Sequence, residues 1–497
     1  MNQQAQLSCL SRRVHGGFGR ALMGAAAYAQ PTSVEGVKAL LSDAVAQGVS
    51  VTLRGNGRSY GDASTTSQGV ILDLSRLNRV LSWDPDTGVI NVESGVTIEQ
   101  IWRLVLPEGY WPAVVPGTMA PTVGGCVAMN IHGKNHFCMG PFGDHVQELD
   151  LLTPQGELLT CSREQHAEIF HAVIGGFGVL GVTTRVQLTL KKVPSGFLKV
   201  TAVTVPNLDT LFDTFESMLP DSDYLVGWTD LFTKGKRLGR SVIHQAQYVS
   251  AADDPLPGRS FTEGQALPER FFGVIPRGLM WRLFQPWVHD LGMRFVNTVK
   301  YRASQLLDGK GRSFLQSHVG FAFLLDYVPR WRDTYGLGGF IQVQPFIPAE
   351  GARETMRRII ETCQAHGIVP YLGVFKRHRA DDFLLSHALD GWSMAMDIRV
   401  TRRNRDRVWA LGQAIGDLVV EAGGHFYFAK DGVARADQVA AAFGEERIST
   451  FRDIKARLDP QGLFSTELSR RILPELPCLS FDEAQGTSAG SLRASGE

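Results

Sequence analysis

The sequence of 497 residues has few cysteines, no excess of either charge and no long apolar run. Its six cysteines show neither CxxC nor regular spacing, which is typical of reduced thiols in a cytoplasmic protein. Lys plus Arg and Asp plus Glu number 50 each, so no basic surface for nucleic acid is indicated. No apolar run approaches the roughly 20 residues that span a bilayer, and the first residues lack the apolar stretch of a signal peptide. We therefore expect a soluble protein, or one that touches the inner face of a membrane peripherally.

Glycine, in contrast, is abundant, with 53 residues gathered in short clusters rather than repeats. Backbone N–H groups can bind a diphosphate only where no side chain intervenes, which is why phosphate-binding loops are rich in glycine. Turn formation alone would explain any one cluster about as well, but three clusters favour a large phosphate-bearing ligand. The clusters are GNGRSYG at 55–61, PGTMAPTVGG at 116–125 and GGFGVLG at 175–181.

The hydrophobic pattern predicts an α+β fold rather than a strict alternation of strands and helices. Helices are expected at 31–48, 98–106, 164–176, 352–366 and 405–422. Strands are expected at 51–53, 70–74, 80–83, 89–92, 146–160, 179–193, 198–205, 242–249, 340–344, 371–375 and 392–400. A long, aromatic-rich and irregular stretch is expected near 250–295.

The first glycine cluster does not match the dinucleotide fingerprint G-x-G-x-x-G. After Gly55 and Gly57 the next glycine is Gly61, one position too late, and the acidic residue expected about 20 positions on is missing. A Rossmann domain for NAD is therefore disfavoured.

Several motifs in order resemble a different cofactor fold. RGNGRSYGD, PGTMAPTVGG, NIHGKNH, GPFGDHVQELDLLTPQGEL, IQVQPFIP, YLGVFK, FYFAKD and LDPQGLFSTELSRR are similar to the vanillyl-alcohol-oxidase family, with its PCMH-type FAD-binding domain. Within it they resemble the branch of decaprenylphosphoryl-ribose oxidases, the FAD subunits of an epimerase that converts lipid-linked ribofuranose to arabinofuranose. The similarity covers most of residues 30–472.

The resemblance implies a two-domain fold with a mixed α/β substrate domain built on an antiparallel sheet. We expect an FAD-binding domain at 15–194, a substrate-binding domain at 195–424 and a C-terminal segment at 425–474 that returns to the FAD domain. Residues 475–497 are mostly small and polar, so a disordered tail is predicted there.

The resemblance also implies residues that bind FAD. Position by position these are Arg54, Gly55, Asn56, Gly57, Arg58, Ser59, Tyr60, Gly61, Gly117, Thr118, Thr122, Val123, Gly124, Gly125, Met129, Asn130, Ile131, His132, Val182 and Tyr427. Many relatives link the flavin covalently through a histidine of the first loop. Arg58 stands at that position here, so a non-covalent FAD is expected.

His132 and His136 are four residues apart, as zinc ligands on a helix are. The glutamate of H-E-x-x-H is absent and glycine follows His132, so no metal is expected. The ordinary interpretation of His136 is a histidine whose ring is hydrogen-bonded to backbone groups. The resemblance instead puts His132 near the flavin or the substrate, as a catalytic candidate.

Oxidation of an alcohol by hydride loss to flavin N5 requires a base for the hydroxyl proton. The resemblance assigns that role to Lys430, although most lysines are solvated surface residues. It assigns substrate binding to Gln342, Gln344, Lys376 and Ser393. One departure affects specificity: the relatives' W-N-x-C motif is here Trp392-Ser393-Met394-Ala395.

The leading functional hypothesis is FAD-dependent oxidation of a secondary alcohol on a polyprenyl-phosphate-linked pentose, giving a 2-keto sugar for arabinose-type precursors of the cell envelope. This function would imply a partner keto-sugar reductase that uses the product, and quinone or oxygen as the electron acceptor. An FAD oxidase of a free sugar, aldonolactone or alditol is the alternative. An FAD-fold protein without catalysis is a third, and the presence of Lys430 argues against it.

The segment from Phe271 to Trp287 carries five aromatic residues with Arg277 and Arg282 interspersed. Buried core would explain this spacing. Aromatic and arginine side chains together also suit a membrane interface, so we hypothesise a lid over the sugar site that rests on the membrane.

Overall fold

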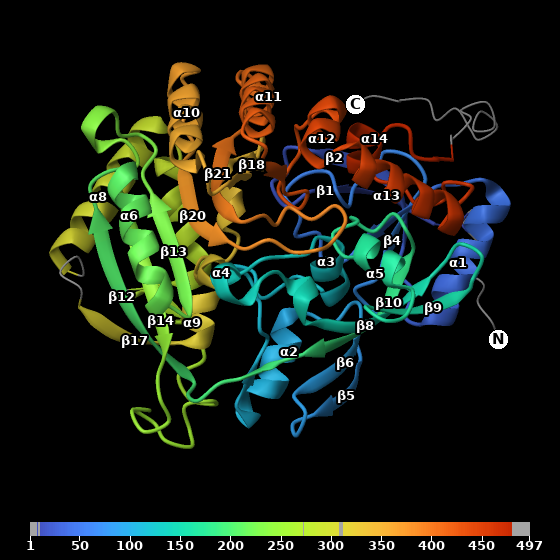
Figure 1. The fold of residues 1–497 in the computed structure, drawn as a ribbon, viewed down its shortest axis with the longest axis horizontal. Helices are drawn as coiled ribbons and strands as arrows, with labels where there is room; N and C mark the ends of the chain where they lie inside the picture. Colours follow the sequence, from blue (N-terminus) through green and yellow to red (C-terminus); the bar gives the residue numbers. More distant parts are fainter. Residues whose placement is uncertain (1–6, 8–9, 272, 308–311, 480–497) are drawn as a thin grey trace, which may run out of the picture.

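The computed structural model of the protein describes residue 7 and residues 10–271, 273–307 and 312–479. Its helices are combined with mainly antiparallel sheets, and the predicted α+β class is confirmed (Figure 1). The part of the predicted tail from 480 to 497, and Phe272 of the aromatic segment, lie outside the described residues.

The N-terminal part of the chain contains two sheets, shown in blue and teal in Figure 1. The first has the order β1-β2-β4-β3 and is parallel except between β1 and β2, whereas the second, β5-β6-β10-β8-β9, is antiparallel. Their strands are β1 (Arg12–Gly16), β2 (Met23–Ala29), β3 (Val51–Arg54), β4 (Val70–Asp73), β5 (Val80–Asp84), β6 (Val89–Glu93), β8 (Val146–Leu152), β9 (Leu158–Ser162) and β10 (Val182–Thr189). The helices are α1 (Val34–Gln47), α2 (Ile98–Val105), α3 (Val123–Ala128), α4 (His136–Met139) and α5 (Ala167–Val173).

Helix α1 shows how local signals set these boundaries. The Ser33 side chain accepts a hydrogen bond from Gly36 N–H, and Gly48 ends the helix with φ of 64°, a conformation that costs glycine least. Between them Val37, Leu40 and Leu41 are buried at helical spacing.

A nine-stranded sheet dominates the second part of the chain. Its order is β17-β12-β14-β13-β20-β21-β19-β22, with β18 also paired to β21. The strands are β12 (Phe197–Val205), β13 (Tyr224–Thr229), β14 (Ser241–Tyr248), β17 (Ser313–Ser317), β18 (Phe340–Val343), β19 (Pro345–Pro348), β20 (Leu372–His378), β21 (Gly391–Arg399) and β22 (His425–Phe426). The short pairs β7 (Tyr110–Trp111) with β11 (Lys191–Lys192) and β15 (Arg270–Phe271) with β16 (Ile275–Pro276) complete the strands.

Helices accompany this sheet and the end of the chain. They are α6 (Leu208–Met218), α7 (Met280–Phe284), α8 (Asp290–Leu307), α9 (His318–Ala322), α10 (Ala352–Ala365), α11 (Arg405–Glu421), α12 (Ala436–Phe443), α13 (Glu445–Leu458) and α14 (Glu467–Ile472). Side chains alternate between the two faces of a strand. On one face Phe375 and Trp392 stack with ring centroids 5.0 Å apart, and both contact Phe212 of α6. The opposite face is therefore free to line a site.

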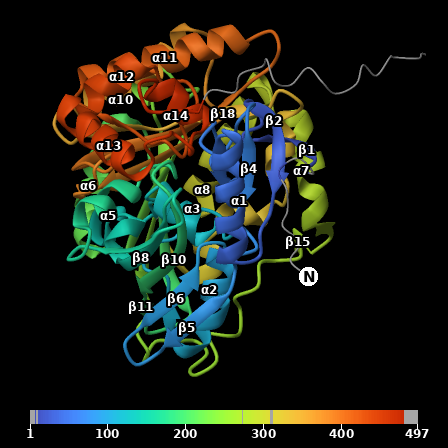
Figure 2. The ribbon, with the colours of Figure 1, turned by 90° about the vertical axis from the view of Figure 1, so that its right-hand side faces the viewer.

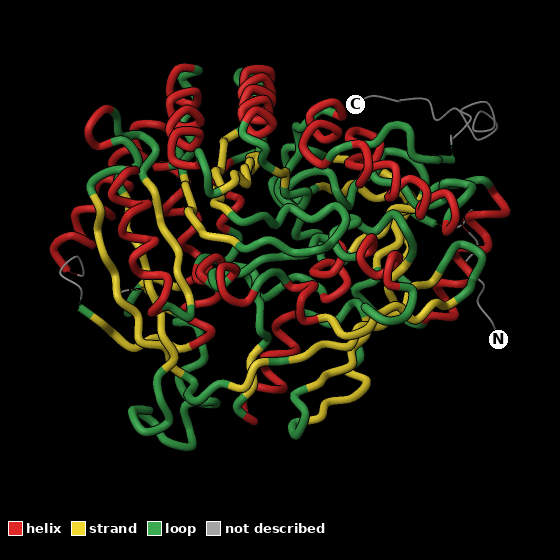
Figure 3. The backbone as a smooth tube through the Cα atoms, in the orientation of Figure 1, coloured by secondary structure: helices red, strands yellow, loops and turns green. Residues whose placement is uncertain are grey.

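The C-terminal segment joins the two parts of the chain. It begins as β22 in the large sheet, and helices α12, α13 and α14 then lie beside the blue N-terminal elements (Figure 2). Val51 of β3 donates to Leu463 O at 2.7 Å and accepts from Ser465 N–H at 3.1 Å. Long loops run between the two parts (Figure 3). The predicted boundaries at 194, 424 and 474 remain predictions.

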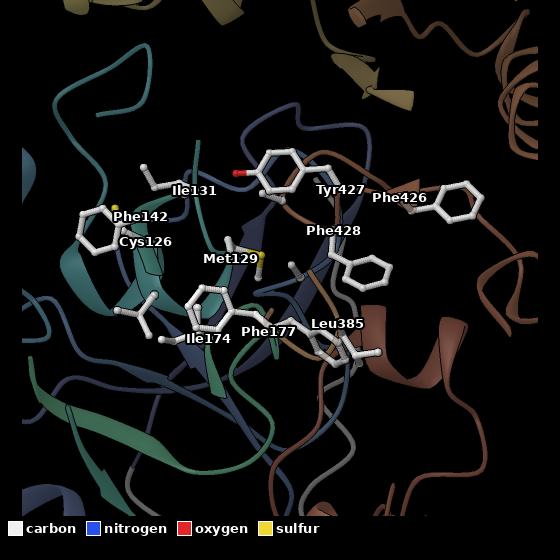
Figure 4. Close-up of a cluster of buried hydrophobic side chains, with 14 of the residues drawn as sticks. Cys126, Met129, Ile131, Phe142, Ile174, Phe177, Leu385, Phe426, Tyr427 and Phe428 are labelled. Atoms are coloured by element: carbon white, nitrogen blue, oxygen red, sulfur yellow. The ribbon is translucent and has the colours of Figure 1, made fainter. Parts of the chain in front are cut away.

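The core beneath these loops combines segments far apart in the sequence. Figure 4 shows Met129 near Phe177 and near Phe428 of the C-terminal segment, with Cys126 of α3 beside Phe142 on one side and Phe426 on the other, and all six side chains are buried. Phe177 and Phe428 pack edge to face, with ring centroids 5.5 Å apart.

Three sequence expectations need correction. Residues 146–160 form a hairpin, not one strand, because Gly156 with φ of 84° makes a turn between β8 and β9. Helix α6 was not expected. Helix α8 starts inside the stretch expected to be irregular, although Leu291, Phe295 and Val299 stand at helical spacing. Among the described residues, no helix is long and apolar enough to cross a membrane.

Candidate functional site

A large cavity lies between the glycine loops and the free face of the nine-stranded sheet. The loops contribute all of residues 53–60, fourteen residues between Val115 and Lys134, and Phe177, Gly178, Gly181 and Thr183. The sheet contributes alternate residues of its central strands, Leu372, Val374 and Lys376 from β20 and Ala395 and Asp397 from β21. The regular alternation of a strand thus brings several chemical groups to one wall.

Glycines of the loops allow close backbone approach. Gly57 has φ of 58°, and a Cβ there would collide with the Arg54 guanidinium. That guanidinium donates to Ser64 O and Gly16 O, both at 3.0 Å, and so fixes the loop. A Cβ at Gly55 would collide with the Thr122 hydroxyl, and one at Gly124 would lie 2.8 Å from Cβ of Ser94. The first two glycine clusters therefore form one packed cradle.

Three polar atoms in the cavity wall are buried and have no partner within the described part of the protein. They are Arg58 Nε, Ser94 Oγ and Gln342 Oε1. Buried polar groups normally have partners, so such atoms indicate a polar ligand. A glycine cradle beside the Arg58 guanidinium fits the diphosphate of FAD. In the described residues no group of histidine, cysteine and carboxylate side chains is arranged to hold a metal ion.

Twenty predicted site residues line the cavity: Arg54, Gly55, Asn56, Gly57, Arg58, Ser59, Tyr60, Gly117, Thr118, Thr122, Gly124, Gly125, Met129, Ile131, His132, Gln342, Gln344, Lys376, Tyr427 and Lys430. Their roles toward FAD or substrate remain predictions.

Five predicted residues do not line the cavity. Gly61 packs against Asp431 O, Val123 donates to Val96 O, and Val182 pairs with Leu152 in the sheet. Asn130 donates to Asp381 and Ser386 and accepts from Gly143 N–H, so its side chain links loops behind the wall. Ser393 is fully buried behind Gln344. The structure gives these five residues supporting positions, with no surface toward the cavity.

Lys430 lines the cavity beside the ring of Tyr60. Its Nζ lies 3.5 Å from the centroid of the Tyr60 ring, and it is held there because Ala429 O accepts the Tyr60 N–H at 2.8 Å. Burial lowers the pKa of Lys430, and the cation of Lys376 lowers it further, while Asp397 opposes both. A lysine whose neutral form is accessible near neutral pH can accept a proton.

Asp397 supplies a carboxylate to the same wall. Gln342, directly across from it in the β18–β21 register, donates to one of its oxygens, and the Tyr335 hydroxyl donates to the other at 3.4 Å. Burial raises the pKa of Asp397, whereas Gln342 and the positive charge of Lys430 lower it. This residue was not predicted.

Two further lysines line the same cavity. Burial lowers the pKa of Lys376 to about 8 and that of Lys134 to about 7. Lys134 donates to the carbonyl oxygens of Phe321 and Ala322. With Arg58 these groups favour an anionic ligand.

His132 is neutral, because burial and the neighbouring cation of Lys376 hold its pKa well below the usual value. Its Nε2 lies 3.0 Å from Nε2 of Gln344, and Lys376 Nζ lies 3.4 Å from its Nδ1. Gln344 donates onward to Ser393 Oγ, which is 2.7 Å from Nε2 of His378. A continuous polar network thus fixes the amide and imidazole that face the cavity.

Sequence signals existed for some of the missed residues. Lys134 belongs to NIHGKNH, a motif used for the resemblance, and Asp397 is two residues after Ala395, on the same face of β21. Ser94 follows β6 without any motif, and only the fold brings it to the cavity.

Comparisons with known proteins agree with this geometry. Residues 25–162 match the family described as FAD binding domain. Over 450 residues the chain is 31% identical to decaprenylphosphoryl-beta-D-ribose oxidase of Mycolicibacterium smegmatis, covering 88% of this chain and 92% of that protein. It is 26% identical to L-gulonolactone oxidase of Mus musculus, with 88% and 92% covered. It is also 26% identical to D-arabinono-1,4-lactone oxidase of Yarrowia lipolytica, with 40% and 38% covered. The predicted cofactor and enzyme class are confirmed: the chain belongs to the family of PCMH-type FAD-dependent oxidoreductases that includes the mycobacterial decaprenylphosphoryl-ribose oxidase.

Proposed function

We propose that this flavoenzyme oxidises a secondary alcohol of a polyprenyl-phosphate-linked pentose to a 2-keto sugar. The observation that carries the proposal is the cavity wall beside the glycine cradle, where Lys430 lies among side chains suited to a sugar and its phosphate. Gln342 and Gln344 present amides, and Lys134 and Lys376 are amines whose charged form an anionic ligand would stabilise. The similarity to decaprenylphosphoryl-beta-D-ribose oxidase supports the same substrate class.

In this proposal the neutral amine of Lys430 accepts the proton of the substrate hydroxyl. Bound FAD supplies the hydride acceptor, flavin N5. Gln342, oriented by Asp397, and Gln344, oriented by Ser393, hold the sugar hydroxyls so that the reacting hydrogen points toward the cofactor. Neutral His132 and cationic Lys376 keep the neighbouring wall polar and positive. The electrons pass on to a quinone or oxygen, and a separate keto-sugar reductase uses the product.

The phosphate of such a substrate would suit Lys134 and Lys376, because a buried cation recovers lost hydration by pairing with an anion. A free sugar or aldonolactone carries no phosphate and would leave these cations unpaired. The similarity to two lactone oxidases nevertheless keeps such substrates as the second candidate. We place the enzyme at the cytoplasmic face of a membrane, where a polyprenyl substrate would be found, as a peripheral protein.

Anaerobic reduction of the flavin tests the proposal. The purified FAD-loaded enzyme is mixed with a polyprenyl-phosphate-ribose in detergent, with ribose 5-phosphate, or with an aldonolactone, and the flavin absorbance is followed. We expect bleaching by the lipid-linked pentose at a kcat/KM far above that for the other two. Preference for the lactone would support the second candidate. Absence of bleaching by any alcohol, with FAD bound, would favour a protein without catalysis.

A further inference from the structure

Exposed large apolar side chains are concentrated in one stretch of the chain. Among the described residues there are nineteen, and thirteen of them lie between Val274 and Leu337. That stretch is a small part of 497 residues, so the concentration is not a general property of the surface. Contiguous exposed apolar surface of this kind marks a contact with another molecule or with a membrane.

Helix α8 presents its apolar side to solvent. Leu291, Phe295 and Val299 are four residues apart and therefore share one helical face, and they are 76%, 56% and 48% exposed. The opposite face is the buried one, and it carries Asn297 and Tyr301 toward the sheet. A surface helix of a globular protein normally has the reverse orientation. In Figure 1 the helix lies at the left-hand side of the molecule, against the outer strands β12 and β14 of the large sheet.

The residues just before α8 extend this face. Trp287 stacks on Phe295 with ring centroids 5.5 Å apart, so the turn and the helix present one surface. We call it the α7–α8 surface; its exposed apolar members are Leu279, Leu283, Phe284, Trp287, Leu291, Phe295, Val299 and Leu306. The segment 271–287, for which a lid was hypothesised, thus includes only part of the α7–α8 surface. Trp281, moreover, is half-buried, with the Arg330 guanidinium 4.8 Å above its ring.

The charge around the α7–α8 surface is positive. Residues 270–306 contain a single acidic side chain, Asp290, and six basic ones: Arg270, Arg277, Arg282, Arg294, Lys300 and Arg302. Arg282, Arg294 and Arg302 are exposed. A second copy of this chain docked on the same face would bring like charges together, which disfavours self-association. Anionic lipid headgroups complement these arginines while the apolar side chains enter the acyl boundary.

We infer that the α7–α8 surface binds the anionic surface of a lipid bilayer, so that the cavity takes its substrate from the membrane. The delivery of substrate rests on the proposed function, whereas membrane binding does not.

The surface and the cavity are joined by a short series of contacts. Tyr371 donates to Asp290 at the start of α8, its ring stacks on that of Tyr335, and the Tyr335 hydroxyl donates to Asp397 in the cavity wall. The site of chemistry therefore lies two aromatic side chains away from the helix that carries the apolar face.

Vesicle binding by the FAD-loaded full chain tests the inference. Sedimentation with phosphatidylcholine vesicles is compared with vesicles of phosphatidylcholine and phosphatidylglycerol in equal parts. The test variant is Leu291→Ser, Phe295→Ser, Val299→Ser. Its matched control is Val14→Ser, Leu104→Ser, Leu158→Ser, which removes exposed apolar side chains elsewhere. A second variant, Arg282→Gln, Arg302→Gln, tests the charge.

We expect wild type and control to bind the anionic vesicles equally, and the apolar variant at least about tenfold more weakly. Each arginine removed should weaken binding about fivefold, and added salt should reduce that difference. Equal binding by wild type and apolar variant would overturn the inference. A second result would also overturn it: a wild-type protein that does not bind vesicles but forms a dimer, with the dimer absent in the apolar variant. Flavin reduction by substrate in detergent is measured on each variant. Vesicle binding without any flavin reduction would refute the proposed function but would still support membrane binding by the α7–α8 surface.

Discussion

The ammonium nitrogen of Lys430 lies directly over the ring of Tyr60, 3.5 Å from its centroid. Tyr60 belongs to the first glycine cluster and Lys430 to the C-terminal segment, and both side chains are buried in the cavity wall. The ring favours the charged amine through a cation–π contact, whereas burial favours the neutral one. The lysine is therefore held at a fixed place with its proton affinity reduced.

Replacing Lys430 by alanine should abolish substrate oxidation without releasing FAD, because its side chain contacts the ring of Tyr60 and is not part of the glycine loops themselves. Loss of a general base costs about 10²–10⁴ in rate. Rapid mixing would measure flavin reduction, and flavin absorbance would measure FAD content. Lys199→Ala, at an exposed lysine, serves as the control. Near wild-type reduction by the Lys430 variant would remove this residue from the mechanism.

Asp397→Asn should change the pH dependence of reduction. The Asp397 carboxylate raises the pKa of Lys430, so its loss should lower that pKa and let the neutral amine persist to lower pH. The reduction rate of the wild type should rise with pH as Lys430 loses its proton. In the variant this rise should occur about one pH unit lower. Asparagine keeps the shape of the side chain and an oxygen that can accept from Gln342, while its amide nitrogen replaces the oxygen that accepts from Tyr335. A merely structural role would leave the midpoint of the rise unchanged.

The flavin should be released by acid precipitation, because Arg58 occupies the position of the linking histidine. Its guanidinium lies 5.5 Å from the centroid of the Phe18 ring and has no nucleophilic atom to offer. Flavin fluorescence in the supernatant measures the release. Yellow colour retained in the pellet after washing in denaturant would contradict the expectation.

Reagents that capture a thiol in this pocket should not attach to the wild type. Ala395 lines the cavity where relatives carry cysteine, and no described cysteine lines it. Cys363 is buried on α10, on the other side of the sheet. In Ala395→Cys an electrophile of suitable size should add one equivalent, detected by intact mass. An adduct on the wild type mapped to residues 390–400 would show that the alignment is shifted.

Four buried histidines should make the fold sensitive to acid. Burial holds the pKa of His136 at about 3 and those of His132, His378 and His387 well below 6.5. The folded protein keeps these rings neutral, so unfolding takes up protons once the pH falls below about 6.5. Each ring should then remove about 1.4 kcal/mol of the free energy of unfolding per pH unit.

Urea unfolding at a series of pH values measures this slope. His387→Phe, which retains the packing against Tyr427 and Phe346, should lower the slope by one proton. A replacement of His366, an exposed histidine, should not. An unchanged slope in the His387 variant would mean that this ring is already charged in the folded protein.

Local patterns predicted much of the fold. Caps and periodicity located α1 and α2, and the glycine clusters located the cradle. Helix α8 was not predicted, although Leu291, Phe295 and Val299 recur at helical spacing; that these side chains face solvent follows only from the fold. The hairpin of β8 and β9 has a local signal, because Pro154 and Gly156 mark the turn between the two strands.

The sequence predicted those site residues that lie within a motif. Lys376, Gln342 and Gln344 line the cavity as the motifs imply, whereas Asn130 and Ser393 turn out to support the wall from behind. Asp397 depends on strand register: it acts on Lys430 only because β21 pairs with β18 and the C-terminal segment returns beside Tyr60. Such long-range pairing leaves no local sequence pattern.

The pairing of Val51 with Leu463 and Ser465 has a consequence for synthesis of the chain. During translation, strand β3 emerges early, but the segment that covers its open edge is made only after residue 460. Ala429 and Asp431, earlier in the C-terminal segment, contact Tyr60 and Gly61 of the first glycine cluster. A nascent or truncated chain that stops short of residue 465 therefore exposes an unpaired strand next to an incomplete cradle, the condition under which edge strands aggregate. The complete cradle therefore requires the segment up to Ser465 to be made and paired with β3.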